Sequence, residues 1–183
     1  MKFRNTTNSW GTLSKALHWT IVLLIINQWL IAERADDLAG LAKLQALAWH
    51  KSFGITIFML AVIRLVWRWI NPVPSLAGVT RSWERLLAHI SHLLLYGLIF
   101  ALPITGWLMS SAKAYSVSWF HLFQLPDLIG KSQPMFELMH DTHEVLFKVL
   151  VGVAVLHAAG ALKHHFIDRN DVLKRMLPFG GVK

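Results

Sequence analysis

The stretch HEVLFKVLVGVAVLHAAGALKHHF, residues 143–166, decides the fold class of this chain. Apart from Glu144, Lys148 and Lys163, its side chains carry no permanent charge. A helix of about 20 mainly apolar residues is long enough to cross the hydrocarbon core of a bilayer. The stretch therefore predicts a transmembrane helix, and it contains four histidines, of which His143 and His157 lie within the span and His164 and His165 at its end.

Three more windows have the same character, at about residues 12–32, 47–70 and 86–110. Pro72 follows the second window, where a helix breaker is expected. The whole chain has 183 residues, of which 55% are hydrophobic and only 15% charged. We therefore expect an all-α, integral membrane four-helix bundle that forms a single domain over residues 1–183, with the fourth span at 143–166.

Basic residues predict the orientation of these spans. Segments 1–15, 68–88 and 163–183 hold 11 Lys and Arg against three acidic residues, whereas segments 33–52 and 110–141 hold five against six. Cytoplasmic loops carry the excess of Lys and Arg in membrane proteins. Both termini are therefore expected in the cytoplasm, and the connection at about 112–141 is expected outside.

The residue counts exclude several kinds of site. The chain has no Cys, which excludes disulfides, iron–sulfur clusters, thiolate-ligated haem and covalent c-type haem. The net charge of +8 arises at the ends of the apolar windows and not in a nucleic-acid-binding module, so no nucleic-acid partner is expected. The first window lacks a cleavage pattern and is interpreted as a retained span.

Ten histidines require a separate explanation, because an ionisable side chain inside a span is costly and marks function. His143 and His157 are 14 residues apart, which is about 1400° of rotation and about 21 Å of rise on a helix. The two imidazoles therefore point within about 40° of each other at two depths of the bilayer.

Each of these histidines needs a partner at its own depth on another span. Orientation and depth pair His18 with His157 toward the cytoplasm and His50 with His143 toward the outside. Two histidines per site suit a low-spin b-type haem whose axial positions are both filled. Zinc is disfavoured because it usually gathers three or four ligands at one point. The alternative is that the imidazoles are hydrogen-bonded helix contacts.

Other residues in the spans extend this hypothesis. Gly54 lies one turn after His50, where the absence of a side chain would admit a porphyrin. Arg64 is on nearly the same face as His50 and is expected to pair with a haem propionate. His89 and His92, an H-x-x-H pair, are second-choice ligands on the cytoplasmic side. Snorkelling to the interface is the alternative for Arg64 and also applies to two further cations, Arg68 and Lys148.

With these residues in place, the chain resembles the bacterial cytochrome b561 family, small four-helix di-haem cytochromes of the inner membrane. The resemblance covers nearly the whole sequence and rests on the order and spacing of six motifs. They are LHW at 17–19, WHKSFGI at 49–55, IRLVWRWINPVP at 63–74, AHISHLLLYGLIFALPITG at 88–106, DTHEVL at 141–146 and LHAAGALKHHFIDRNDVLKRMLP at 156–178.

The resemblance implies two non-covalent haem b groups on His18, His50, His143 and His157. It also implies electron transfer to or from the quinone pool, with ubiquinone or menaquinone as the partner, in the bacterial inner membrane. Superoxide:ubiquinone oxidoreductase activity is an alternative, although six acidic residues against five basic ones outside would not attract superoxide. A membrane-anchor subunit of a dehydrogenase and a histidine-lined metal transporter are further alternatives. The electron donor is not predicted, and no catalytic residue is assigned.

Overall fold

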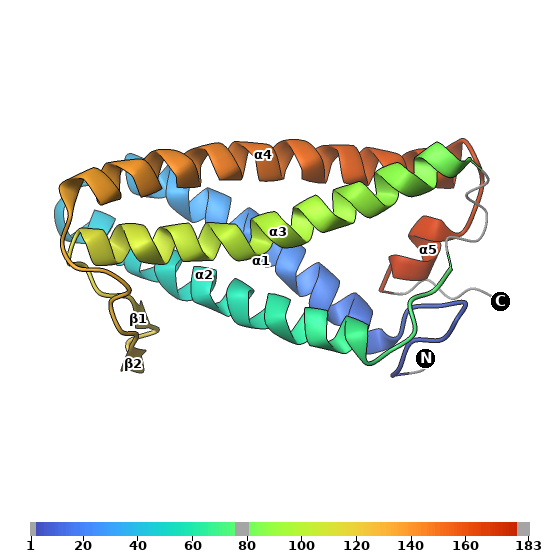
Figure 1. Ribbon diagram of the computed structural model, residues 1–183, viewed down its shortest axis with the longest axis horizontal. Helices are drawn as coiled ribbons and strands as arrows, with labels where there is room; N and C mark the ends of the chain where they lie inside the picture. Colours follow the sequence, from blue (N-terminus) through green and yellow to red (C-terminus); the bar gives the residue numbers. More distant parts are fainter. Residues whose placement is uncertain (1–2, 76–80, 179–183) are drawn as a thin grey trace. The chain divides into compact units, whose positions relative to one another are not determined.

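The computed structural model describes residues 3–75 and 81–178. Lys2 and Lys183, which contribute to the charge asymmetry of the sequence, lie outside these ranges. The described chain is all-α apart from one short hairpin (Figure 1). Its elements are α1 (Thr12–Asp36), α2 (Gly40–Trp69), α3 (Ser82–Ala112), β1 (Ser118–Trp119), β2 (Phe123–Gln124), α4 (Gln133–Phe166) and α5 (Val172–Met176).

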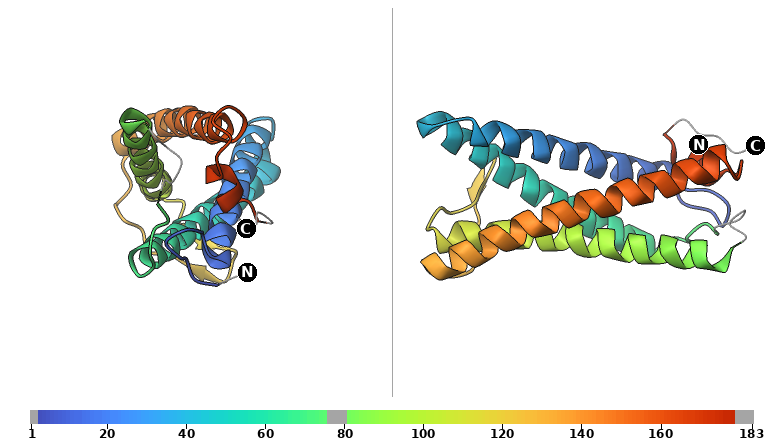
Figure 2. Two further views of the ribbon diagram at one scale, coloured as in Figure 1. Left: turned by 90° about the vertical axis from the view of Figure 1, so that its right-hand side faces the viewer. Right: turned by 90° about the horizontal axis from the view of Figure 1, so that it is seen from above.

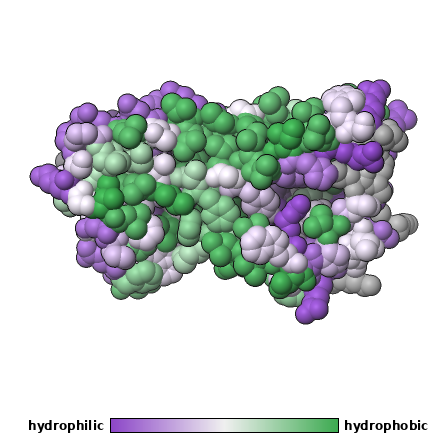
Figure 3. Space-filling view, viewed as in Figure 1, coloured by the Kyte–Doolittle hydropathy of each residue, from purple (hydrophilic) through white to green (hydrophobic). Residues whose placement is uncertain are grey.

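Four of these helices, α1 to α4, are long and apolar enough to cross a membrane. Large apolar side chains project from them into the surroundings, including Leu93, which is 73% exposed, and Leu156, which is 71% exposed. In Figure 3 apolar residues cover most of the long helices, and hydrophilic residues gather toward the helix ends. A surface of this kind belongs in lipid, so the chain is a membrane protein with four spanning helices.

Local residues set the helix boundaries. Gly40 has a φ of +58°, a left-handed conformation that glycine adopts without strain, and it allows α2 to start with only three residues between it and the end of α1. The hydroxyl of Ser132 accepts a hydrogen bond from the backbone N–H of Met135 and caps the first turn of α4. For this reason α4 begins ten residues before the apolar window at 143–166. Helix α3 continues through Pro103.

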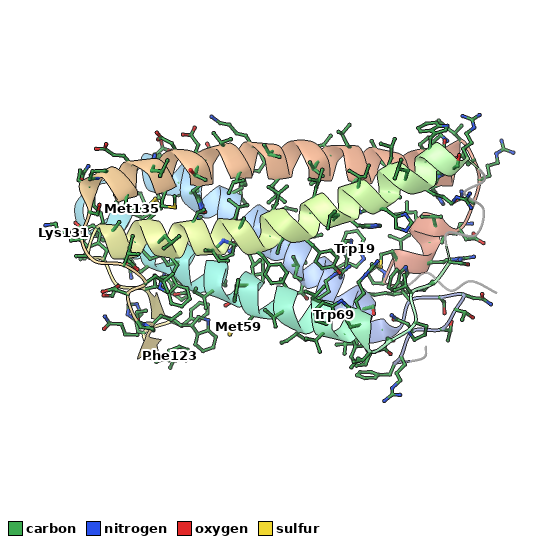
Figure 4. All side chains as sticks on the ribbon, viewed as in Figure 1. Trp19, Met59, Trp69, Phe123, Lys131 and Met135 are labelled. Atoms are coloured by element: carbon green, nitrogen blue, oxygen red, sulfur yellow. The ribbon has the colours of Figure 1, made fainter. Side chains whose placement is uncertain are left out.

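The chain divides into two compact units, and each long helix contributes one segment to each. The first unit consists of Met1–Thr20, Val62–Gly97 and Leu150–Lys183, and the second of Ile21–Ala61 and Leu98–Val149. In the first unit α5 lies beside the beginning of α1, where the indole N–H of Trp19 donates to the Met176 carbonyl at 2.9 Å (Figures 2 and 4).

The hairpin β1–β2 belongs to the second unit and is attached to α2. The Ser52 hydroxyl donates to the Ser118 carbonyl and accepts from the Phe120 backbone N–H, each at 3.0 Å. The Trp119 indole donates to the hydroxyl of Thr56 at 3.1 Å. The sequence predicted only that the connection at about 112–141 lies outside, and the structure folds part of it into an antiparallel pair packed on a helix.

Candidate functional site

His50 on α2 and His143 on α4 face each other in the second unit, with ring centroids 6.3 Å apart. We call these two residues, with Thr105, the His50 site. A metal–imidazole bond is about 2.0–2.1 Å long, so two imidazoles on opposite sides of one metal ion have centroids about 6.3 Å apart. The observed spacing therefore fits a metal ion between the two rings.

A hydrogen bond assigns the tautomer of His143. Its Nδ1 lies 2.9 Å from the hydroxyl oxygen of Thr105, which itself donates to the Leu102 carbonyl at 2.9 Å. Because the Thr105 proton is already used, the proton of the second bond must come from His143 Nδ1. The Nε2 atom then carries the free lone pair, which is the state required of a metal-binding imidazole.

The environment of His50 leaves its ring open to a ligand. Its Nδ1 is buried and has no hydrogen-bond partner among the described residues. The amide nitrogen of Gln28, on α1, donates to the His50 carbonyl at 2.9 Å, while the amide oxygen of Gln28 is buried without a partner in the described chain. Unpaired buried polar atoms are rare in folded proteins, and a bound cofactor is one cause of them.

Two glycines allow close approach around the His50 site. A Cβ at Gly106 would lie 3.3 Å from the His143 ring, and one at Gly54 would lie 3.2 Å from the Gln28 amide nitrogen. Gly106 therefore makes room for the imidazole itself. At Gly54 the space created by the missing side chain borders Gln28.

The first unit contains a second group of histidines, here called the His157 cluster: His18, His92 and His157. The rings of His92 on α3 and His157 on α4 are 5.1 Å apart, too close for a metal ion in line between them. His18 on α1 interacts electrostatically with both of the other two. The structure thus brings the predicted pair His18 and His157 into one neighbourhood and adds His92 to it.

Arg64 on α2 is the cation of this cluster. Its guanidinium donates to the Tyr96 hydroxyl and to the Ser14 carbonyl, each at 3.2 Å. It interacts electrostatically with all three histidines of the cluster. No carboxylate forms an ion pair with it within the described ranges, so its charge is available to an anionic ligand.

The remaining candidates from the sequence lie elsewhere. His89 is exposed, and its Nδ1 is 2.6 Å from the Arg85 carbonyl of its own helix. Lys148 is exposed and pairs with Glu144 at 2.7 Å, as expected for a cation that reaches away from the apolar region. Arg68 lies over the ring of Tyr96, with 6.0 Å between the guanidinium carbon and the ring centroid.

The sequence matches the family of the prokaryotic cytochromes b561 over residues 9–179. The chain belongs to this family. It is 36% identical over 182 residues to cytochrome b561 homolog 2 of Escherichia coli (strain K12), a match that covers 97% of this chain and 95% of that protein. It is 29% identical over 173 residues to the probable superoxide oxidase CybB of Yersinia pestis, covering 92% and 96% of the two chains.

The b561 family implies haem b and electron transport, and the His50 site fits that cofactor. The His50 site supplies two facing imidazoles at the required separation, one of them with an assigned free Nε2. Gln28 and Thr105, which contact these histidines, were not predicted as site residues. Both are polar residues within apolar spans, and this is the signal in the sequence that points to them.

Proposed function

We propose that this b561 cytochrome holds two haem b groups and transfers electrons between them across the bacterial inner membrane. His50 and His143 would hold one haem, and His18 and His157 the other. The observation that carries the proposal is the 6.3 Å separation of the His50 and His143 rings, together with the bond that keeps the proton on Nδ1 of His143. The haem iron, when bound, supplies the one-electron chemistry.

The residues of the chain would orient and tune the cofactors. Thr105 holds the His143 ring in its ligating tautomer, and the apolar spans exclude water from both sites. Arg64 would pair with a propionate, because its charge has no protein anion beside it in the described chain. Gly54 would leave space beside His50 for the edge of the porphyrin.

A visible spectrum and a pyridine haemochrome assay of the purified protein test this proposal. We expect two non-covalent b haems per chain in the wild type and one in each of two variants, His143→Ala and His157→Ala. Retention of both haems in either variant would refute the assignment of that ligand. A folded protein without any haem would refute the function.

Quinone is the redox partner that we propose, with superoxide oxidation as a second candidate. The name of the Yersinia pestis relative supports the second candidate. Rapid superoxide loss that depends on added quinone would support it, whereas haem reduction only by a protein donor would count against it. Such a donor, if it co-purified, would instead indicate the anchor subunit of a dehydrogenase.

We also propose that both termini lie in the cytoplasm, as the charge asymmetry predicts. The chain has no Cys, so a single introduced cysteine can be labelled without background. An impermeant maleimide added to intact spheroplasts should label His121→Cys in the hairpin and should leave Asn8→Cys unlabelled. The opposite pattern would reverse the orientation.

A further inference from the structure

An open apolar groove of about 360 Å³ lies within the second unit, and one of its lining residues, Trp49, directly precedes His50 in α2. It is lined by Ile31 and Arg34 of α1 and by Ala46, Trp49 and Phe53 of α2, and only apolar atoms of these residues face it. We call it the Trp49 groove. Its volume is in the range of small-molecule sites in proteins, which is roughly 300–1,000 Å³.

One wall of the groove is aromatic. The rings of Trp49 and Phe53 are stacked, with centroids 5.9 Å apart and an interplanar angle of 27°. Phe120 of the hairpin packs edge-on against both, at 5.6 Å from Trp49 and 5.2 Å from Phe53. Phe120 is not itself a lining residue of the groove, but it supports the two rings that are.

The hairpin holds Phe120 there at a conformational cost. Phe120 and His121 have φ values of +48° and +60°, in a left-handed region that is unfavourable for residues with a Cβ. The Ser52 and Thr56 contacts of the hairpin keep the turn in place. Strained residues of this kind persist where the surrounding structure determines them, and they cluster at functional sites.

Arg34 gives the groove a polar end. It is exposed, and no carboxylate pairs with it among the residues that the structure describes. Its aliphatic stem can line the groove while its guanidinium remains free to donate to an oxygen of a ligand. A ligand that fits must therefore have a flat ring, an oxygen acceptor and an apolar remainder.

We propose that the Trp49 groove binds the ring of a membrane quinone or quinol, with a ring oxygen toward Arg34. The inference rests on the proposed function, and it locates the quinone site next to the His50 site, because Trp49 precedes His50 in α2 and Phe53 follows one turn later. An acyl chain of a phospholipid would fill the apolar volume but has no ring to stack on Trp49 or Phe53. The stacked rings therefore favour the quinone.

The electron balance is simple. A quinol gives up two electrons and two protons when it becomes a quinone. The two haems of the proposed function would accept one electron each, and the two protons would pass to water beside the exposed Arg34.

Photolabelling of the wild-type protein with an azidoquinone tests the site without any turnover. Mass spectrometry should locate the label in residues 31–34 and 46–53, and an excess of ubiquinone-1 should compete it away. Labelling confined to other residues would overturn the proposal. Photolabelling does not depend on the number of bound haems. It therefore tests quinone binding in the groove independently of the proposed di-haem function.

A second experiment measures haem reduction by decylubiquinol in the variants Trp49→Leu and Phe53→Leu. The matched control is Trp69→Leu, which removes an exposed Trp from the other end of the same helix. We expect a KM for the quinol that is about 2- to 10-fold higher in the first two variants, the range that corresponds to one aromatic stacking contact. The control should match the wild type.

Dithionite, which needs no binding site, should reduce the haem of all three proteins equally and reports their haem content. Equal KM values in Trp49→Leu, Phe53→Leu and the control would overturn the proposal. Loss of phospholipid adducts from Trp49→Leu in native mass spectra, with an unchanged KM, would assign the groove to lipid and would also overturn it.

Discussion

Thr105 on α3 accepts a hydrogen bond from Nδ1 of His143 on α4, with 2.9 Å between the two heavy atoms. The acceptor is itself oriented, because its own proton goes to the Leu102 carbonyl. A neutral imidazole can place its single proton on either nitrogen, and this bond decides which. The membrane interior offers no water to satisfy a buried N–H, so the contact has no substitute.

Thr105→Val should therefore weaken the proposed haem site at His143. Valine keeps the shape of threonine but removes the acceptor, and loss of such a supporting contact typically lowers metal affinity about 10- to 100-fold. We expect partial loss of one haem in a pyridine haemochrome assay after detergent washing.

Thr105→Ser is the matched control, since it retains the hydroxyl and should retain both haems. A Thr105→Val protein that holds two haems as firmly as the control does would show that the bond is unimportant for binding.

His92 and His18 should behave differently as alanine variants. The 5.1 Å between the rings of His92 and His157 is too short for an iron atom between them, so we predict that His18, and not His92, completes the site. His18→Ala should reduce the content from two haems to one, and His92→Ala should leave two. The reverse result in the same assay would make His92 the ligand.

The long helices could be predicted from the sequence because a membrane span is a matter of length and composition. The start of α4 could not, because the Ser132 cap lies outside any apolar window. The hairpin also escaped prediction. Its turn at Phe120 and His121 contains neither Gly nor Asn, the usual residues for positive φ, and it depends on Ser52, 68 residues before Phe120.

Depth in the membrane was enough to predict that His50 and His143 lie together, and in the structure the centroids of these two rings are 6.3 Å apart. Depth does not determine the rotation of a helix about its own axis. For this reason the approach of His92 to His157 was not predicted. Contacts between distant residues are not readable from one sequence either. Thr105 and His143, for example, are 38 positions apart.

Arg64→Gln should lower the midpoint potential of one haem. A positive charge near a haem favours the reduced state, which carries one more electron, and a unit charge at about 10 Å is worth on the order of 1 kcal/mol at an effective dielectric constant of 20. We expect a downward shift of tens of millivolts in a potentiometric titration.

Lys148→Gln serves as the comparison for Arg64→Gln, because it removes a positive charge from an exposed ion pair. Equal potentials in the two variants and the wild type would contradict the role of Arg64.

Asn5 should be the most sensitive residue of the N-terminal segment. Its buried side-chain oxygen accepts from the Gly11 backbone at 2.9 Å and from the Ser14 hydroxyl at 2.7 Å, and its nitrogen donates to the Pro72 carbonyl at 3.1 Å. Asn5→Ala leaves these groups unpaired and should lower the free energy of unfolding by about 1–3 kcal/mol. Thermal unfolding in detergent would measure the change, and Asn8→Ala, at an exposed position, should have no comparable effect.

Asp168, just beyond the end of α4, should make the stability of the protein depend on pH. Its carboxylate accepts from the Lys163 ammonium at 2.8 Å, in a network that also joins Lys163 to Glu84 at 2.6 Å. The hydrogen bond from Lys163, with a further one from His164, lowers the pKa of Asp168 below its ordinary value. The contribution to stability is thus present above the pKa of an unfolded aspartate, about 3.9, and is lost as the pH falls through the lower native value.

The apparent Tm of the wild type should drop between pH 6 and pH 3, and Asp168→Asn should show a lower Tm at pH 6 with a smaller drop. Asp171→Asn, which alters a neighbouring half-exposed aspartate outside this network, should keep the wild-type dependence. An unchanged pH dependence in Asp168→Asn would contradict the prediction.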